Sequence, residues 1–276
     1  MTYQENYQKW ADFADLPDYL RQDLEAMDEK TKEDAFYTNL EFGTAGMRGY
    51  IGAGTNRINI YVVRQATEGL AKLVESKGEE AKKRGVAIAY DTRHFSPEFA
   101  FESAQVLAAH GIKSYVFESL RPTPELSFAV RHYNAIAGIM VTASHNPKEF
   151  NGYKVYGEDG GQMPPADASA LTDYIRGIDN PFAVALADLE ESKANGLITV
   201  LGEETDRLYL DELKDININK DLIAEYGKDM KIVYTPLHGT GEMLARRALA
   251  EAGFESVQVV EAQATADPDF STVKSP

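Results

Sequence analysis

The sequence predicts an α/β fold: a mixed, mostly parallel sheet with helices on both faces, followed by an incomplete second α/β domain. Two observations support this prediction. Between residues 86 and 143, short apolar runs typical of buried strands alternate with segments of helical spacing. Such alternation favours parallel strands joined by right-handed crossovers. The alternation then starts again at residue 231.

The first 85 residues precede this pattern. Residues 1–40 are predicted to form short helices, because 16-LPDYLRQDLEAM-27 has apolar residues at helical spacing. The stretch 42-FGTAGMRGYIGAGTN-56 is predicted to be a glycine-punctuated loop. A helix is expected over residues 60–78, with Gly78 at its end.

The central segments are bounded by recognisable start and stop signals. For the helix at 97–111, Ser96 is the predicted N-cap, Pro97 occupies the first position and Gly111 lies past the end. The predicted strands are 86–93, 114–118, 135–143 and 152–157, and the other predicted helices are 124–134 and 165–177.

A second domain is predicted after the polar stretch 188–206. Strand, helix and strand are expected within residues 231–261, and the join VLAAHGIKSYVFE resembles the later ALAEAGFESVQVV. We therefore divide the chain into residues 1–205 and residues 206–276. One strand, one helix and one strand cannot cover both faces of a parallel sheet, so we expect this chain to be a fragment of a longer protein.

The composition excludes several classes of protein. The net charge of −16 disfavours nucleic acid and anionic membranes as partners. No apolar window approaches a membrane span of roughly 20 residues, and the polar start is unlike a signal peptide. The absence of cysteine excludes disulfides and fits a reducing compartment, which we expect to be the cytoplasm. An anionic ligand would need a local group of basic residues.

The stretch 142-TASHNPKEFNGYKVY-156 holds the strongest candidate site. Ser144 follows the strand 135–143, and ligands of open parallel sheets bind outside the carboxyl ends of strands. Pro147 stops the strand from continuing, so the turn projects the serine hydroxyl out of the sheet. His145 can share its proton, and Lys154 can act as a base if nearby cations lower its pKa. The alternative is that Ser144 and Asn146 only hydrogen-bond the turn.

Three further motifs are candidates. In 43-GTAGMRG-49 the glycines allow backbone N–H groups to approach an anion, and Arg48 can grip phosphate oxygens; the alternative is a tight turn with a surface arginine. In 90-YDTRHFSP-97 we expect Asp91 and Arg93 to pair and shape the loop. The glycines of 236-PLHGTG-241 either bind phosphate at a helix N-terminus or form a packing turn.

The ordered motifs FGTAGMRG, YDTRHFSP, RPTPELSFAV, MVTASHNPKEFNGYKVY and YTPLHGTG resemble those of the α-D-phosphohexomutases. Within that family the chain looks most like bacterial phosphoglucomutases, and the resemblance runs from about Phe42 to Ser256. It implies that Ser144 is a phosphoserine that donates its phosphate to O6 of glucose 1-phosphate. Glucose 1,6-bisphosphate would form, turn over in the cleft and return its C1 phosphate to Ser144.

The resemblance also assigns roles to other residues. His145 and Lys154 would handle the proton of the sugar hydroxyl, and Arg48 would face the transferring phosphate. Thr44 and Asn146 are further candidates for substrate binding. Mg²⁺ would bind through the phosphate on Ser144 together with an Asp-x-Asp-x-Asp loop, which this sequence lacks.

We therefore predict an intramolecular phosphotransferase acting on a phosphosugar, with no obligate protein partner. The predicted reaction interconverts glucose 1-phosphate and glucose 6-phosphate, and the fragment alone is expected to be largely inactive. Phosphomannomutase or phosphopentomutase activity is an alternative within the family. A non-catalytic phosphosugar-binding module and a serine-nucleophile phosphatase are alternatives from other classes.

Overall fold

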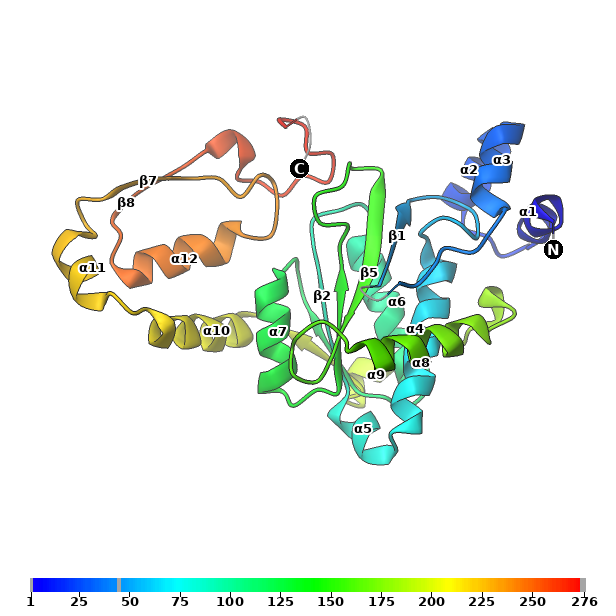
Figure 1. Ribbon diagram of the computed structural model, residues 1–276, viewed down its shortest axis with the longest axis horizontal. Helices are drawn as coiled ribbons and strands as arrows, with labels where there is room; N and C mark the ends of the chain where they lie inside the picture. The colour runs from blue at the N-terminus through cyan, green and yellow to red at the C-terminus, as the bar shows by residue number, and fades with distance from the viewer. Residues whose placement is uncertain (1, 44–45, 274–276) are drawn as a thin grey trace.

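A six-stranded mixed sheet forms the centre of the molecule (Figure 1). The computed structural model describes residues 2–43 and 46–273. The strand order is β1-β5-β4-β2-β3-β6; β2 pairs in parallel with β3 and β4, β3 pairs in parallel with β6, and β5 runs antiparallel to β1 and β4. The strands are β1 (Met47–Tyr50), β2 (Val86–Tyr90), β3 (Ser114–Phe117), β4 (Ala137–Val141), β5 (Phe150–Tyr156) and β6 (Ile198–Leu201). The prediction of a mixed, mostly parallel sheet is confirmed.

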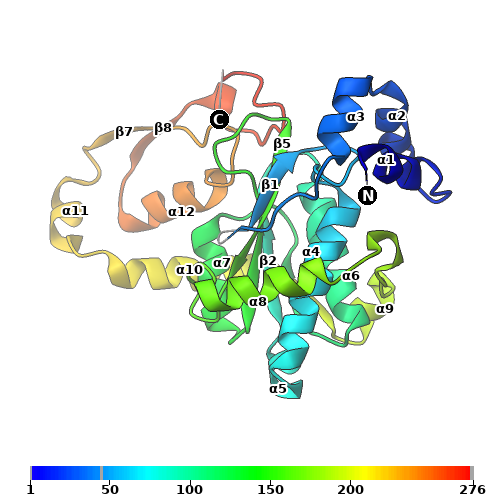
Figure 2. The same ribbon diagram turned by 45° about the vertical axis from the view of Figure 1, so that its right-hand side comes forward.

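Helices cover both faces of this sheet, as predicted (Figures 1 and 2). Because successive strand residues point to opposite faces, Val86 and Ile88 of β2 pack in one cluster with α4 (Ile60–Ser76) and α6 (Ser96–Ala109). Ala87 and Ala89 pack in the other cluster, with α7 (Thr123–His132). The first cluster also takes in α8 (Pro165–Arg176). The central strands are therefore buried on both sides, which explains their unbroken apolar sequence.

Short helices at the N-terminus pack against the same core. They are α1 (Tyr3–Ala11), α2 (Asp18–Ala26) and α3 (Glu29–Phe36). Thr2 begins α1 with a capping box, in which its hydroxyl accepts from the Glu5 amide while the Glu5 carboxylate accepts from the Thr2 amide. Trp10 is buried in edge-to-face contact with Phe36 and Tyr61. These contacts make the segment a packing arm, built from short helices as the sequence predicted for residues 1–40.

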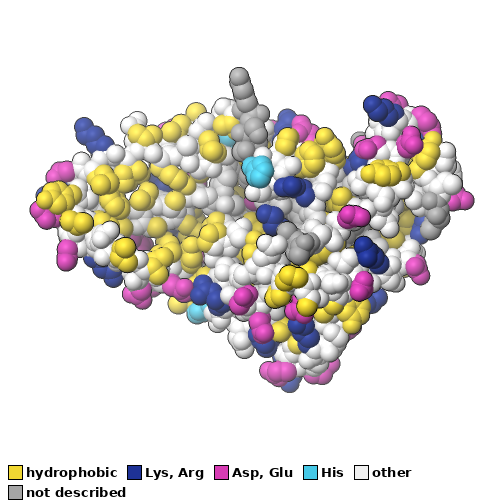
Figure 3. Space-filling model, viewed as in Figure 1, with side chains coloured by type: hydrophobic (Ala, Val, Ile, Leu, Met, Phe, Trp, Pro, Cys, Tyr) yellow, Lys and Arg dark blue, Asp and Glu magenta, His cyan; other side chains and the backbone are white. Residues whose placement is uncertain are grey.

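A two-stranded parallel sheet follows, built from β7 (Lys231–Tyr234) and β8 (Ser256–Val259). Its helices are α10 (Glu203–Ile216), α11 (Lys220–Tyr226) and α12 (Glu242–Ala252). Exposed hydrophobic side chains gather over this part of the molecule (Figure 3, left). They include Ile216, Ile218, Leu222, Tyr226, Met230 and Val233. The C-terminal segment then returns to the main sheet beside β5 (Figures 1 and 2).

The structure corrects three expectations. The glycine-rich stretch is partly a strand, because Met47–Tyr50 pairs along β5 as an edge strand. The polar stretch 188–206 contains α9 (Leu189–Ala194) and β6, in which Thr199 is partly buried and Val200 is exposed, as on an edge. Ser96 does not cap α6; Phe95 precedes the helix in a left-handed conformation, and the Ser96 hydroxyl donates to Asp91.

The remaining elements are α5 (Glu79–Arg84) and two short helical turns, η1 (Pro181–Ala183) and η2 (Glu261–Gln263).

Across the described ranges, none of the helices has the length and apolar character needed to span a bilayer.

Candidate active site

Ser144 lies in a left-handed turn directly after β4. Its φ is +58°, a conformation that non-glycine residues seldom adopt. Its amide donates to Oγ1 of Thr142 at 2.9 Å, so Thr142 supplies the side-chain bond that stabilises this turn. Among residues 2–43 and 46–273, the Ser144 hydroxyl makes a single long contact, 3.4 Å to Nδ1 of His145, and Ser144 is exposed. The turn thus leaves the serine oxygen directed away from the backbone.

Arg93 anchors the loop that presents this serine, residues 142–150, here called the serine loop. The Arg93 side chain is 1% exposed. Nη1 donates to the carbonyls of Pro147 and Phe150 at 2.8 and 2.9 Å, and Nη2 donates to those of Ser144 and Asn146 at 2.9 and 2.6 Å. One guanidinium therefore binds four backbone acceptors of a loop without regular structure, among which the Pro147 carbonyl also accepts from the Phe150 amide at 3.1 Å.

Asp91 connects the anchor to its neighbours. Its Oδ2 accepts from Thr142 Oγ1 at 2.5 Å and lies 3.5 Å from Nε of Arg93, while Oδ1 accepts from the Arg93 amide and the Ser96 hydroxyl. Asn151 donates to the Ser96 hydroxyl in turn. Burial raises the pKa of Asp91, and the hydrogen bonds from Thr142 and the Arg93 amide oppose that rise. The expected Asp91–Arg93 pair is present and shapes the loop.

Ser144, His145 and Lys154 share one cavity of about 390 Å³. Met140 and Lys154 are directly paired across β4 and β5, so the lysine points to the same side of the sheet as the strand end that leads to Ser144. The opposite wall comes from the loop 236–240, with Leu237, Gly239 and Thr240, and from Phe270. The cavity therefore lies between the two sheets of the chain.

Positive charge is concentrated beside this cavity. Arg48 on β1 is paired with Gly152 of β5, which makes it a diagonal neighbour of Lys154 on the same face. Burial lowers the pKa of Lys154, and the charge of Arg48 lowers it further, while Asp91 acts in the opposite direction. Burial and Arg48 thus both favour the neutral amine of Lys154.

Two of the predicted site residues that the structure describes stand apart from the cavity lining. Arg48 is exposed on β1 and influences Lys154 through its charge. Asn146 belongs to the anchored part of the serine loop, and its Oδ1 is buried without a hydrogen-bond partner among the described residues. Thr44 falls outside the residues that the structure describes. Around it, Gly43 and Gly46 exchange two backbone hydrogen bonds, and a Cβ on Gly46 would lie 2.1 Å from the Tyr153 carbonyl.

Sequence reasoning missed several residues of the site. Thr142 has a recognisable signal, since a threonine two residues before an amide it can accept from is typical of a side-chain turn. Thr123 at the start of α7 and Phe270 near the C-terminus line the cavity but carry no such signal. Their approach to Ser144 is a product of the tertiary fold alone.

The other histidines have structural partners. His110 lies 2.7 Å from Glu68 and 2.9 Å from Glu75, and His132 stacks on Phe128. His94 contacts Asp269 at 3.2 Å, and His238 is buried between Thr265 and Thr272. These contacts indicate structural roles for His94, His110 and His132.

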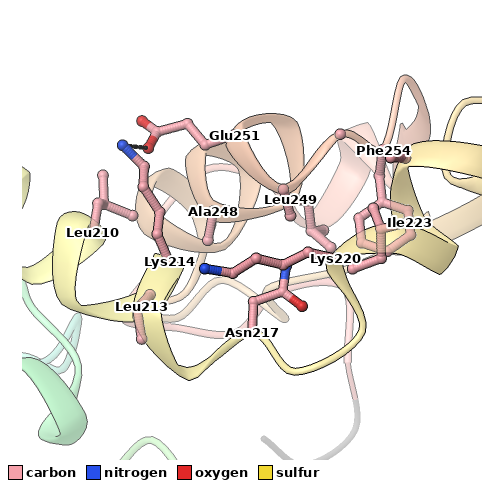
Figure 4. A pocket seen from close by; sticks show the side chains of 13 residues that line it. Leu210, Leu213, Lys214, Asn217, Lys220, Ile223, Ala248, Leu249, Glu251 and Phe254 are labelled. Carbon is pink, nitrogen blue, oxygen red and sulfur yellow. Dashed lines mark ion pairs between the residues drawn. The ribbon is translucent and has the colours of Figure 1, made fainter.

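A larger groove, of about 630 Å³, lies between α10, α11 and α12 (Figure 4). Leu210, Leu213, Ile223, Leu249 and Phe254 line it, together with an ion pair between Lys214 and Glu251 at 3.1 Å. Among the residues that the structure describes, its lining includes no serine, threonine or histidine, and none of the predicted site residues lines it. The cavity at Ser144 is therefore the candidate active site despite its smaller volume.

The described residues do not form a Mg²⁺ site. Within residues 2–43 and 46–273, no group of three or more His, Asp or Glu side chains is arranged to hold a metal ion. The nearby Asp269 already pairs with Lys148 and His94. Asp267 accepts from the amides of Asp269 and Ser271. A phosphate on Ser144 would add oxygen ligands of the kind that Mg²⁺ binds together with one or two carboxylates and several waters.

Taken together, the fold and this site define an α/β protein that presents a serine hydroxyl among positive groups at the carboxyl ends of parallel strands. Comparison with known families agrees. The model for phosphoglucomutase/phosphomannomutase alpha/beta/alpha domain I matches residues 39–182, and the model for domain II matches residues 207–276. The chain belongs to the phosphoglucomutase/phosphomannomutase family, and its resemblance to phosphohexomutases is confirmed.

Comparison with individual proteins also finds phosphoglucomutases and phosphomannomutases. A phosphoglucomutase of Staphylococcus haemolyticus is 40% identical over 244 residues, which are 88% of this chain and 43% of that protein. A candidate phosphomannomutase of Thermus thermophilus aligns with a TM-score of 0.69 and 26% identity, over 86% of this chain and 48% of the other. Parafusin of Paramecium, in an open form, shares the fold with a TM-score of 0.66 and 20% identity. The alignment covers 86% of this chain and 45% of parafusin. The chain spans less than half the length of these relatives.

Proposed function

We propose that this chain supplies the phosphoserine half of a phosphoglucomutase site, with Ser144 as the residue that carries the phosphoryl group. The observation that supports this most is the left-handed turn at Ser144, in which Thr142 and Arg93 bind the backbone and the serine lines a cavity. The names of the curated relatives favour glucose 1-phosphate and glucose 6-phosphate as the substrates.

In the proposed reaction, O6 of glucose 1-phosphate attacks the phosphorus atom on Ser144. The O6–P bond forms, the P–Oγ bond breaks, and the O6 proton passes to the neutral amine of Lys154. Oγ of Ser144 takes a proton from His145, whose Nδ1 lies 3.4 Å away. After the bisphosphate turns over, the same steps in reverse return its C1 phosphate to Ser144 and release glucose 6-phosphate. Arg48 contributes positive charge, which phosphoryl transfer requires more than covalent chemistry.

We further propose a division of labour within the chain. Residues 1–205 present and anchor Ser144, while the part from residue 206 provides the opposite wall of the cavity through loop 236–240. Because the described residues hold no metal cluster, we expect this chain alone to load phosphate on Ser144 but to turn over little substrate. A composition without cysteine suits the cytoplasm as the place of this activity.

The experiment is intact mass measurement with phosphopeptide mapping, after the chain is incubated with glucose 1,6-bisphosphate. We expect one added phosphate, located on Ser144 and absent from Ser144→Ala. A chain that never gains phosphate on Ser144 would favour a non-catalytic phosphosugar-binding module. The same experiment with mannose and ribose bisphosphates tests the sugar, and faster loading from either would point to a phosphomannomutase or phosphopentomutase.

A further inference from the structure

The segment 267-DPDFS-271 reaches the serine loop from more than 100 residues further along the chain. Phe270 is 7% exposed, lines the cavity of Ser144, and its ring centroid lies 5.3 Å from Cζ of Arg93. Arg93 is the residue that holds four carbonyls of the serine loop. Phe270 therefore covers the anchor of the loop and keeps water from its guanidinium.

Asp269, the neighbour of Phe270, makes a second contact with the same loop. Its Oδ1 accepts from Nζ of Lys148, within the serine loop, at 3.1 Å, and lies 3.2 Å from Nε2 of His94. Lys148 is followed closely by Phe150, one of the residues bound by Arg93. One carboxylate thus joins the serine loop to the loop after β2.

The segment has a rigid internal structure of its own. The Asp267 carboxylate accepts from the amides of Asp269 and Ser271, both at 2.9 Å, and the Asp267 carbonyl accepts from the amide of Phe270 at 3.1 Å. Phe270 has a φ of +50°, which is unfavourable for a bulky residue but directs its ring at Arg93. These bonds fix the direction of the phenyl ring.

His238, from the motif 236-PLHGTG-241, makes contacts with residues on both sides of the segment 267–271. Buried His238 donates from Nδ1 to the carbonyl of Thr265 at 2.9 Å and accepts at Nε2 from the hydroxyl of Thr272 at 2.7 Å. These partners lie on either side of residues 267–271. The motif therefore contributes to the cavity wall with Leu237 and Gly239 and fixes the segment with His238.

We propose that residues 267–271 form a clamp on the serine loop, in which Phe270 and Asp269 are positioning residues that keep Ser144 directed into the cavity. The proposal rests on the proposed function insofar as Ser144 is the group being positioned. The two contacts differ in strength. Asp269 and Lys148 are each about half exposed, so their pair is screened by water. The contact between Phe270 and Arg93 is buried, and its loss should have the larger effect.

Hydrogen exchange of the amides in residues 142–151 tests the clamp without depending on activity. In Phe270→Ala we expect exchange there to be about five- to thirty-fold faster, because a desolvated cation–π contact is lost. In Asp269→Asn we expect the exchange to be about two- to five-fold faster, because the lost ion pair is exposed. Phe270→Tyr keeps the aromatic face and should restore the protection. Phe254→Ala is the matched control, since it removes a phenylalanine from the groove between α10 and α12, away from the serine loop.

The rate of Ser144 phosphorylation by glucose 1,6-bisphosphate is the second readout. We expect it to fall in Phe270→Ala, recover in Phe270→Tyr and stay unchanged in Phe254→Ala. Equal exchange in Phe270→Ala and Phe254→Ala would overturn the clamp, and so would faster exchange with an undiminished rate. If the unaltered chain is never phosphorylated, the proposed function fails at that step, and exchange alone decides whether the clamp holds the loop.

Discussion

Nη2 of Arg93 donates to the backbone carbonyl of Ser144 at 2.9 Å, which links a residue after β2 directly to the turn that follows β4. The same guanidinium binds three more carbonyls of the serine loop. Its planar fork is what allows one side chain to reach four acceptors. The conformation of Ser144 therefore depends on a residue 51 positions earlier in the chain.

Arg93→Lys tests this anchor. A lysine keeps the charge but cannot reach all four carbonyls, so several buried acceptors lose their partners. We expect the free energy of unfolding to fall by about 3 kcal/mol, and Ser144 phosphorylation to slow at least about tenfold. Urea unfolding followed by circular dichroism measures the first effect. Arg207→Lys, at an exposed ion pair, is the control and should change stability by less than about 1 kcal/mol. Equal losses in both variants would remove Arg93 from its anchoring role.

Glycine and alanine at position 144 test the left-handed turn. Because φ is +58° there, glycine is favoured over alanine, and we expect Ser144→Gly to be more stable than Ser144→Ala by about 1 kcal/mol. The same two substitutions at His145, whose φ is not positive, should show no such preference for glycine. Chemical denaturation of the four variants makes the comparison. A preference for alanine at position 144 would mean that the serine turn has another conformation in solution.

Removing the charge of Arg48 should change the titration of Lys154. Burial and Arg48 both lower the pKa of Lys154. In Arg48→Gln the second influence disappears, so the pKa of Lys154 rises and its neutral amine appears only at higher pH. The rate of reductive methylation of Lys154 against pH, followed by peptide mapping, should shift to higher pH. Arg48→Lys keeps the charge and should leave the profile close to the original. An unshifted profile in Arg48→Gln would show that the two residues do not interact.

A buried cluster between α7 and α10 gives a prediction about pH and stability. Arg121 donates to both oxygens of Asp206 at 2.7 and 2.8 Å, and the fully buried Glu125 lies 3.7 Å from Arg121. Burial and the neighbouring Asp206 raise the pKa of Glu125 from its ordinary 4.5 to about 9. Folded Glu125 thus keeps its proton where the unfolded chain has lost it. Its contribution to the free energy of unfolding therefore declines as the pH rises from about 4.5 to about 9.

Glu125→Gln removes that decline, because its amide is neutral throughout. We expect the variant to differ from the unaltered chain by less than about 1.5 kcal/mol at pH 5, and to gain stability relative to it as the pH rises. Urea unfolding at several pH values measures the difference. Asp206→Asn breaks the charged pair instead and should cost about 3 kcal/mol. A Glu125→Gln variant that loses stability relative to the unaltered chain with rising pH would show that Glu125 is ionised in the folded state.

The central elements could be predicted because their signals are local. Apolar runs such as 86-VAIAY-90 and caps such as Pro97 and Gly111 depend on neighbouring residues only. The strand at Met47–Tyr50 was missed because two of its flanking glycines suggest a turn, and only pairing with β5 makes it a strand. The strand Ile198–Leu201 was missed because it is a four-residue edge strand within a polar stretch, which leaves too short an apolar run to recognise.

The residues of the candidate site also fall into a group that the sequence could predict and a group that it could not. Ser144, His145 and Lys154 lie within one motif, and the pairing of β4 with β5 brings them into one cavity. The roles of Phe270 and His238 depend on contacts across more than 100 residues or between loops of the second sheet. Nothing near either residue in the sequence indicates such contacts. Distance along the chain, more than chemical type, therefore limited what the sequence could predict.

The most direct test of the account is transfer of a labelled phosphoryl group through Ser144. The chain is incubated with glucose 1,6-bisphosphate carrying labelled phosphate, separated from the sugar, and then mixed with glucose 1-phosphate. We predict that the label first enters Ser144 and then leaves as glucose 1,6-bisphosphate, with no label on Ser144→Ala. Label that never enters Ser144, or that leaves it only as inorganic phosphate, would contradict the proposal that Ser144 is the phosphoryl carrier of a mutase.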